Sequence, residues 1–307
     1  MSPVISAEIV AGALILLAVL ALTYIFVRRR LLASGAPLML SAHGSAPEIV
    51  AAAQANDRFV VNAVCPLVTK VHHEARVRAE KGYTILYVGH AGHDEAVGTL
   101  AVAPDAIRLV EHDEDLAGAL GTVDDPGKVA LLAQTTLALH DWEGIAGEAR
   151  GRFPDLWTAA RNDLCFATTN RQSALSAIAA RADAVVVIGS ANSSNTIALA
   201  KVATAAGCQH VVRVDGPEEL DRDAFGAAEV VGVTAGASAP EDVVQAVIAA
   251  LAPTDGVELV HVTDEDEYFP PPRELRELIP TDDRTISAAE VLAGLVRTSS
   301  APVRDPD

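Results

Sequence analysis

Short polar segments recur along this 307-residue chain, and each follows an apolar run and precedes a stretch with helical spacing. They are SAHGSAPE, CPLVTKVHHEA, GHAGHDEAVGT, QTTLA, CFATTNRQ, GSANSSNT and AGASAPE. In parallel αβ sheets, ligands bind beyond the carboxyl ends of the strands, where the first turns of helices present free N–H groups. Hydroxyl, amide and imidazole side chains therefore converge on one edge, which is the arrangement expected for an anionic ligand such as a diphosphate.

The turn that contains Ser193, Ser194 and Asn195 illustrates this chemistry. Its hydroxyl and amide groups, with the backbone N–H groups of the helix that follows, can hold phosphate oxygens. Ser and Asn are also preferred N-cap residues, so one such turn fits a simple helix cap equally well.

Two further turns have the same ambiguity. Thr135 lies in QTTL, and Ser238 lies in SAPE, where Glu241 stands at the spacing of a capping box. Three such turns in one chain favour a phosphate site over a set of caps.

Titratable side chains occupy similar strand ends. His43 in SAHG and His93 in GHDEAVGT can donate to an anion or polarise a hydroxyl. Glu95, two residues after His93, can supply or relay a proton. The alternative for either histidine is a loop residue without a role.

Cys65 and Cys165 each end an apolar run and precede a helix, where a thiolate can reach a metal. The alternative for an isolated cysteine is a buried structural residue, and we assign that role to Cys208. The cysteines are far apart and form no CxxC pair, which argues against a secreted disulfide scaffold.

The composition restricts the class of protein. Half of the residues are apolar, so the chain can bury a substantial core, and 23 basic against 41 acidic residues leave a net charge of −18. A nucleic-acid partner is not expected, because no basic face is visible. The sequence has no GxGxxG after a strand, no Walker A segment and no HExxH, so NAD, ATP and metalloprotease functions lack support.

An uncharged apolar run from Ile9 to Val27 precedes Arg28, Arg29 and Arg30. About 20 apolar residues span a bilayer as a helix. Because the arginines follow the run, the positive-inside rule predicts a single-pass anchor in the cytoplasmic membrane with the body of the protein in the cytoplasm. A buried core helix is the alternative.

Apolar runs alternate with Ala-rich helical stretches after this segment, which predicts parallel αβ layers. Helical spacing marks Ser173–Ala182 and Glu241–Leu251. The expected strands are Pro37–Leu40, Arg58–Val64, Tyr83–Gly89, Lys128–Gln134, Ala184–Ser190, His210–Val214 and Glu229–Gly236.

The polar segments, in order, resemble the signature segments of the IspH/LytB reductases. The resemblance covers about Leu38–Ile279 and is carried by SAHG, CPLVTKVH, GHAGHDEAVGT, QTT, CFATTNRQ, GSANSSNT and GVTAGASAPE. The resemblance implies reduction of 4-hydroxy-3-methylbut-2-enyl diphosphate to isopentenyl and dimethylallyl diphosphates, the last step of non-mevalonate isoprenoid synthesis. It also implies three αβ lobes around a [4Fe–4S] cluster held by three cysteines, with ferredoxin or flavodoxin as the electron donor.

The resemblance assigns roles residue by residue. Cys65 and Cys165 match two of the cluster ligands, and Glu95 matches the acid that delivers protons to the allylic hydroxyl. The residues that match the substrate pocket and the diphosphate clamp are His43, His93, Thr135, Ser193, Ser194, Asn195 and Ser238.

The sequence also departs from the family pattern. No cysteine precedes Cys65, so the family's first cluster cysteine and the turn that carries it have no counterpart here, and Asn62 replaces the usual acidic residue. We therefore expect an anchor and basic flank at 1–37, a remnant of the first lobe at 38–65, a second lobe at 66–163, a third at 164–280 and a polar tail at 281–307. Two functions remain open: a membrane-tethered reductase, or a non-catalytic relative that binds a prenyl-type diphosphate.

Overall fold

The computed structural model describes residues 37–55, 59–160, 162–263 and 269–276. The predicted anchor at Ile9–Val27 lies outside these ranges. No helix within them is long and apolar enough to span a bilayer. The chain forms two compact units. The described parts of the first are 37–41, 47–55, 59–63 and 270–276, and those of the second are 42–46, 64–160, 162–263 and 269.

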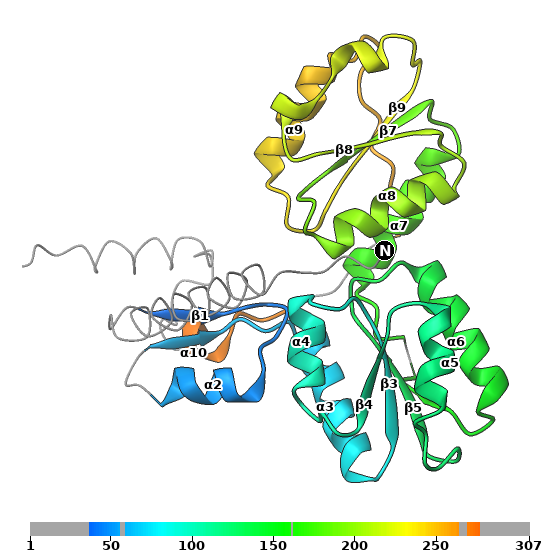
Figure 1. Ribbon diagram of the computed structural model, residues 1–307. Coiled ribbons are helices and arrows are strands. Elements are labelled where there is room, and N and C mark those ends of the chain that lie inside the picture. The colour runs from blue at the N-terminus through cyan, green and yellow to red at the C-terminus, as the bar shows by residue number, and fades with distance from the viewer. Residues whose placement is uncertain (1–36, 56–58, 161, 264–268, 277–307) are drawn as a thin grey trace, which may run out of the picture. The chain divides into compact units, whose positions relative to one another are not determined.

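The first unit contains a small parallel sheet. Strands β1 (Leu38–Leu40) and β2 (Val60–Asn62) pair with Leu38 opposite Val60. Helix α2 (Pro47–Gln54) connects them, and the short helix α10 (Arg273–Arg276) packs against β2 (Figure 1).

The first sheet of the second unit has four parallel strands in the order β4-β3-β5-β6. Residues of β3 and β5 alternate between two apolar layers: Leu86 and Leu131 face α5 and α6, whereas Ile85 and Leu132 face α3 and α4. Because both faces are covered, β5 is apolar throughout and β3 is mostly apolar. The elements are α3 (Pro66–Glu80), β3 (Thr84–Val88), α4 (Asp94–Leu100), β4 (Ile107–Val110), α5 (Asp113–Leu120), β5 (Val129–Ala133), α6 (Leu139–Arg152) and β6 (Trp157–Thr158).

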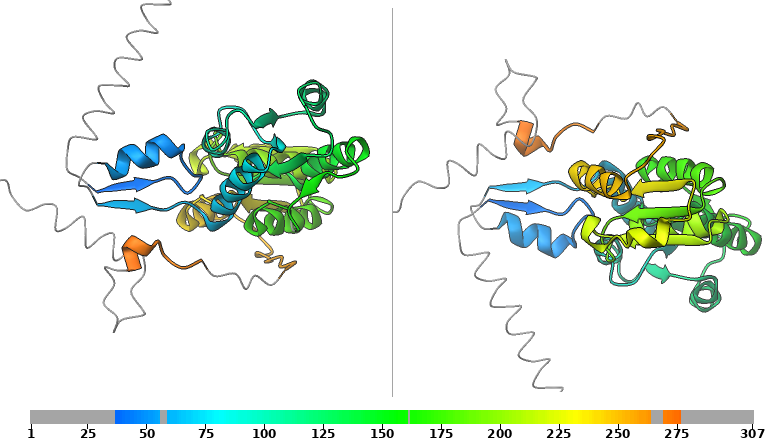
Figure 2. Two further views of the ribbon diagram at one scale, coloured as in Figure 1. Left: turned by 90° about the horizontal axis from the view of Figure 1, so that it is seen from below. Right: turned by 90° about the horizontal axis from the view of Figure 1, so that it is seen from above.

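The second sheet of this unit has three parallel strands in the order β8-β7-β9, with helices on both faces (Figure 2). Val185 and Val187 pack against α7 and α8, and Val186 packs on the side of α9. The elements are α7 (Phe166–Ala179), β7 (Ala184–Ile188), α8 (Ser194–Ala205), β8 (His210–Val214), the 3-10 turns η1 (Pro217–Glu219) and η2 (Arg222–Phe225), β9 (Val231–Ala235) and α9 (Glu241–Leu251).

The predicted class of α/β fold with parallel sheets is confirmed. Strands β4 and β6 were not expected from the sequence, because the four residues of β4 are polar at Arg108 and β6 is a two-residue edge strand. Cys208 is buried in the core beside β7, as expected for a structural residue. The capping box of Ser238 and Glu241 is wrong: α9 begins at Glu241, with Pro240 at the N-cap and no side-chain cap. Proline disfavours helical geometry in the residue before it, so the helix does not begin earlier.

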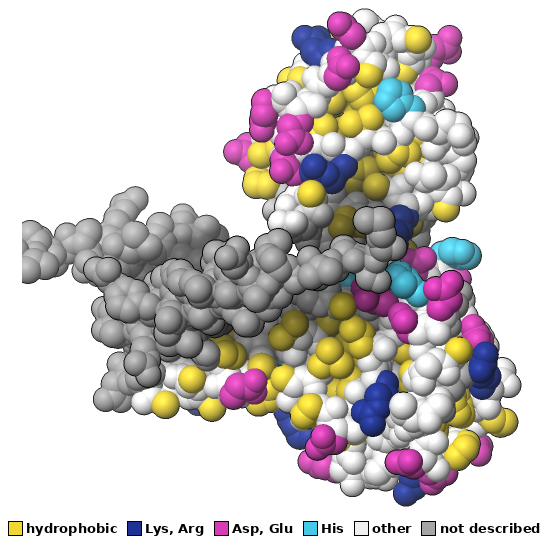
Figure 3. All heavy atoms as spheres, in the orientation of Figure 1, with side chains coloured by type: hydrophobic (Ala, Val, Ile, Leu, Met, Phe, Trp, Pro, Cys, Tyr) yellow, Lys and Arg dark blue, Asp and Glu magenta, His cyan; other side chains and the backbone are white. Residues whose placement is uncertain are grey.

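The acidic residues lie mostly on the surface. On the face shown in Figure 3, acidic side chains of the second unit are scattered, and its Lys and Arg side chains stand singly. This face therefore carries no concentrated basic patch among the described residues.

Candidate active site

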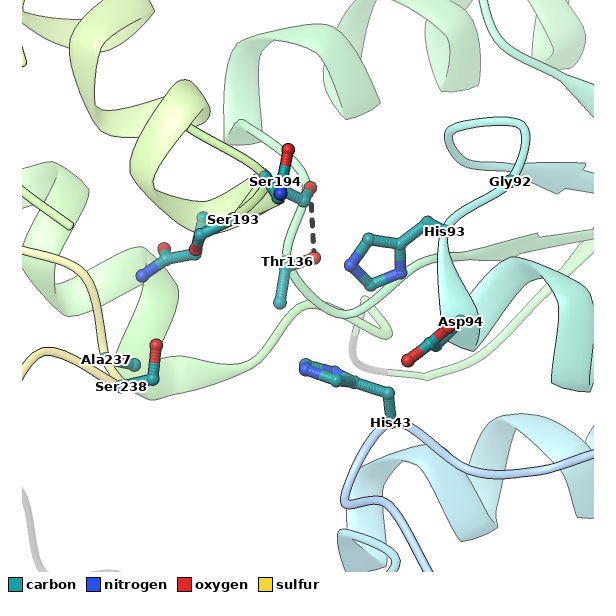
Figure 4. Close-up of a pocket in the computed structure, with 11 residues that line it drawn as sticks. His43, Gly92, His93, Asp94, Thr136, Ser193, Ser194, Ala237 and Ser238 are labelled. Atoms are coloured by element: carbon teal, nitrogen blue, oxygen red, sulfur yellow. Dashed lines mark hydrogen bonds between the residues drawn. The ribbon is translucent and has the colours of Figure 1, made fainter. Parts of the chain in front are cut away.

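A cavity of about 400 Å³ opens at the carboxyl ends of β3, β5, β7 and β9 in the second unit. It is lined by imidazole, hydroxyl and amide groups, and no Lys or Arg is among the described lining residues (Figure 4). This size suits a small organic ligand. The lining residues are His43, Gly92, His93, Asp94, Thr136, Asn192, Ser193, Ser194, Asn195, Ala237 and Ser238.

The Glu95 carboxyl group is fully buried in the first turn of α4. Its two oxygens accept hydrogen bonds from the backbone N–H of Thr135 at 2.7 Å and from the Thr135 hydroxyl at 2.9 Å. Burial raises the pKa of Glu95 from its ordinary value of 4.5 to about 7, although the bonds from Thr135 oppose the shift. A carboxyl group with this pKa can donate a proton at neutral pH.

Gln134 joins the loops around the cavity. Its Oε1 accepts the backbone N–H of His90 at 2.9 Å, so its Nε2 faces the hydroxyls of Thr136 and Ser194 and donates to them at 2.8 and 3.0 Å. The Thr136 hydroxyl also donates to Ser194 Oγ at 3.2 Å. Because Ser194 Oγ accepts two bonds, its own hydrogen is left to donate to a ligand.

His93 acts as the N-cap of α4, since its Nδ1 accepts the backbone N–H of Glu95 at 3.2 Å. Burial, and then the neighbouring His43, lower the pKa of His93. The neutral ring with an accepting Nδ1 carries its proton on Nε2 and can donate it. The rings of His43 and His93 meet edge to face with centroids 5.2 Å apart, and both extend into the space that Thr136 lines (Figure 4).

The N-cap and first turn of α8 contribute two further donors to the cavity. Ser193 Oγ accepts the backbone N–H of Thr196, which confirms that it is a helix cap and leaves its hydrogen available. Asn195 is 5% exposed, and neither its side-chain nitrogen nor its side-chain oxygen has a hydrogen-bond partner among the described residues. Because an unpaired buried amide costs about 1–3 kcal/mol, a ligand that pairs with it gains affinity.

Cys65 and Cys165 are the N-caps of α3 and α7, and neither side chain is used as a cap. Both thiols are partly exposed, and Cys165 is among the charges that raise the pKa of Cys65, after the larger effect of burial. Helix N-termini favour thiolates, so the pair suits an iron–sulfur group as two of its ligands. No cluster of three or more His, Cys, Asp or Glu side chains in the described ranges could hold a metal ion, so these residues supply two thiols.

The structure brings together most of the residues that the sequence singled out. His43, His93, Ser193, Ser194, Asn195 and Ser238 line one cavity, whereas Glu95 and Thr135 lie behind its wall. Thr135 faces Glu95 and not the cavity, while its neighbour Thr136 lines the cavity and was not expected. Gln134 was also missed, although its place at the end of an apolar run was a usable signal.

Comparisons with a family model and with individual proteins give the same family. Residues 8–252 match the family described as LytB protein. The 4-hydroxy-3-methylbut-2-enyl diphosphate reductase of Rhodopirellula baltica is 45% identical over 249 residues, which is 79% of this chain and 76% of that protein. The Paracoccus denitrificans protein of the same name is 43% identical over 80% of this chain and 78% of its own length.

A solved structure shares the fold. The E-1-hydroxy-2-methyl-but-2-enyl-4-diphosphate reductase from Plasmodium falciparum superposes with a TM-score of 0.73 at 28% identity, over 80% of this chain and 77% of that chain.

We expect Glu95→Gln to stabilise the protein at alkaline pH. The raised pKa means that the folded state favours the protonated carboxyl group, so this stabilising contribution is complete below about pH 4.5 and is lost as pH rises through about 7. The amide of glutamine can still bond the backbone N–H and the hydroxyl of Thr135. Because it does not ionise, the variant does not lose this stability as the pH rises. At pH 8 the variant should gain on the order of 2 kcal/mol in the free energy of unfolding, measured in urea, and the gain should shrink towards pH 5. Glu148→Gln on the exposed face of α6 is the control, and an equal gain at both pH values would contradict the prediction.

Proposed function

The chain belongs to the LytB protein family, and we propose that it reduces 4-hydroxy-3-methylbut-2-enyl diphosphate to isopentenyl and dimethylallyl diphosphates. The observation that carries the proposal is the Asn195 side chain, which is buried in a cavity lined by hydroxyl groups and has no hydrogen-bond partner within the described part of the chain. A diphosphate oxygen accepts hydrogen bonds from the amide and hydroxyls together. The raised pKa of the adjacent Glu95 suits a substrate whose hydroxyl group must leave as water.

The reaction breaks the allylic carbon–oxygen bond, consumes two electrons and two protons, and releases water. A [4Fe–4S] cluster at Cys65 and Cys165 would supply the electrons, which the family resemblance traces to ferredoxin or flavodoxin. Glu95 donates a proton toward the leaving hydroxyl, and Thr135 keeps the Glu95 carboxyl group in place through both of its oxygens. The neutral His93 donates Nε2–H to the substrate, because its other nitrogen caps α4.

One observation favours the non-catalytic alternative. The described residues supply two thiols, and a cluster that rests on three thiolates needs another ligand. The two functions differ in turnover and not in diphosphate binding. Assays of both on one preparation therefore separate them.

We expect Glu95→Gln to abolish most turnover while it leaves binding intact. Proton donation contributes about 10²–10⁴-fold to catalysis, and the amide has no acidic proton. Anaerobic full-length protein, supplied with a low-potential chemical reductant, should lose at least about a hundred-fold in rate with the substitution. The parent rate should fall as pH rises through about 7, where Glu95 ionises. Glu148→Gln is the control.

If Glu95→Gln turns over at the parental rate, Glu95 is not the proton donor. If the parent binds the diphosphate and shows no turnover with iron restored, the chain is the non-catalytic relative.

Asn195→Ala and Ser238→Ala should each weaken binding of the substrate. Losing a hydrogen bond to a charged group costs about 1.5–3 kcal/mol, or roughly ten- to a hundred-fold in affinity. Asn195→Asp keeps the shape and adds a negative charge, so it should weaken binding further. Isothermal calorimetry with the diphosphate measures these changes, and Ser176→Ala on α7 is the control. Unchanged affinity in all three variants would show that these side chains do not hold the diphosphate.

We further propose that Ile9–Val27 anchors the protein in the cytoplasmic membrane with its body in the cytoplasm. The length of the apolar run and the arginines that follow it support this. The full-length chain should stay with membranes after carbonate washing, and proteases added to spheroplasts should not cleave its body. A chain released by carbonate would refute the anchor.

A further inference from the structure

A buried carboxylate connects the two cysteine-bearing segments. Asp163, whose side chain is 1% exposed, accepts a hydrogen bond from Lys70 Nζ at 3.1 Å through Oδ1. Its Oδ2 accepts the backbone N–H of Ala133, at the end of β5, at 3.2 Å. One side chain thus joins helix α3, strand β5 and the segment before α7.

The end of the edge strand β6 explains why a carboxylate occupies this place. β6 pairs with β5 only at Ala130 and Leu131. The backbone N–H of Ala133 therefore lies beyond the end of β6 and finds no carbonyl acceptor on that strand. A buried N–H without an acceptor is costly. The Asp163 oxygen takes the position that a strand carbonyl would have, and the segment is thereby held against the sheet.

The same two residues lie close in sequence to the thiols. Lys70 is five positions after Cys65 on α3, and Asp163 is two positions before Cys165. The Cys165 backbone N–H also bonds the Thr135 carbonyl at 2.8 Å, so both the carboxylate and the backbone fix this turn on β5.

We propose that the ion pair of Lys70 and Asp163 is a positioning device that sets the separation of the Cys65 and Cys165 thiols. Without it, α3 and the turn before α7 would have no direct side-chain hydrogen bond or ion pair among the described residues. Asp163 is buried, whereas the Lys70 side chain is 39% exposed, so this ion pair adds little to stability: desolvation of the carboxylate and access of water to the ammonium group offset the attraction. Hydrogen bonds of defined direction do, however, hold the joined segments in a single geometry, whereas apolar contacts allow several. This inference rests on the proposed function, since it concerns the thiols that would hold the cluster.

The separation of the thiols can be measured without activity. Full-length protein, stripped of metal with a chelator under reducing conditions, is treated with dibromobimane, which becomes fluorescent when it bridges two neighbouring thiols. Parent protein should bridge Cys65 and Cys165, and Cys65→Ser or Cys165→Ser should abolish the signal. Lys70→Met should lower the bridging rate about ten-fold, because misplaced reacting groups lose effective concentration.

Monobromobimane, which reacts with single thiols, separates positioning from general loosening. With Lys70→Met its reaction rate at both cysteines should stay at the parental value. Lys70→Arg, which keeps a cation near Asp163, should restore most of the bridging. Arg152→Met, which removes the exposed pair with Glu148 on α6, is the matched control and should change neither rate.

Equal bridging in parent and Lys70→Met would overturn the inference while leaving substrate binding and reduction untouched. A parent that does not bridge would overturn it as well, because the thiols would not share one space. If Lys70→Met instead raised the monobromobimane rate at both cysteines, the ion pair would contribute to stability and not to the positions of the thiols. If Lys70→Met does not fold, Asp163→Asn tests the same bond, since its amide oxygen still accepts the Ala133 N–H while the attraction for Lys70 is lost.

Discussion

The hydrogen bonds at the carboxyl end of strand β5 connect three parts of the candidate site: the segment before α7, the carboxyl group on α4 and the start of α8. Ala133 donates to Asp163, Gln134 donates to the hydroxyls of Thr136 and Ser194, and Thr135 holds the Glu95 carboxyl group. β5 can serve this purpose because all five of its residues are buried and strands flank it on both sides. Groups placed on so rigid an element keep their relative positions, which a loop alone would not ensure.

The ligand that we propose for the cavity is an anion, although the protein carries a net charge of −18. No cation lines the described part of it, and Asp94 contributes a negative charge. Neutral donors take the place of cations here, namely the imidazole that caps α4, hydroxyls whose oxygens already accept bonds, and the first turn of α8. Such donors are strong when partly buried, because water competes less for them.

Several of these groups are unfavourable to the folded protein on its own. Both a buried carboxyl group with its pKa raised to about 7 and a buried amide with no partner in the described ranges lower stability in the unliganded protein. Sites that bind and react commonly carry such costs, and the apolar layers on both faces of the two sheets compensate for them. Stability and function are thus divided between the layers and the strand ends.

The sequence alone determined the parallel αβ class and the polar turns, because apolar runs of buried strands and the cap residues of helices are local signals. It also indicated His93, Glu95 and the Ser193–Asn195 turn. Only the tertiary structure decided which of two adjacent threonines faces the cavity: Thr135 turns to Glu95 and Thr136 to Ser194. It likewise decided that Asp163 reaches Lys70, 93 positions away. Pairings of this kind depend on which strand ends lie together, and that is set by packing over long sequence distances and by no local pattern.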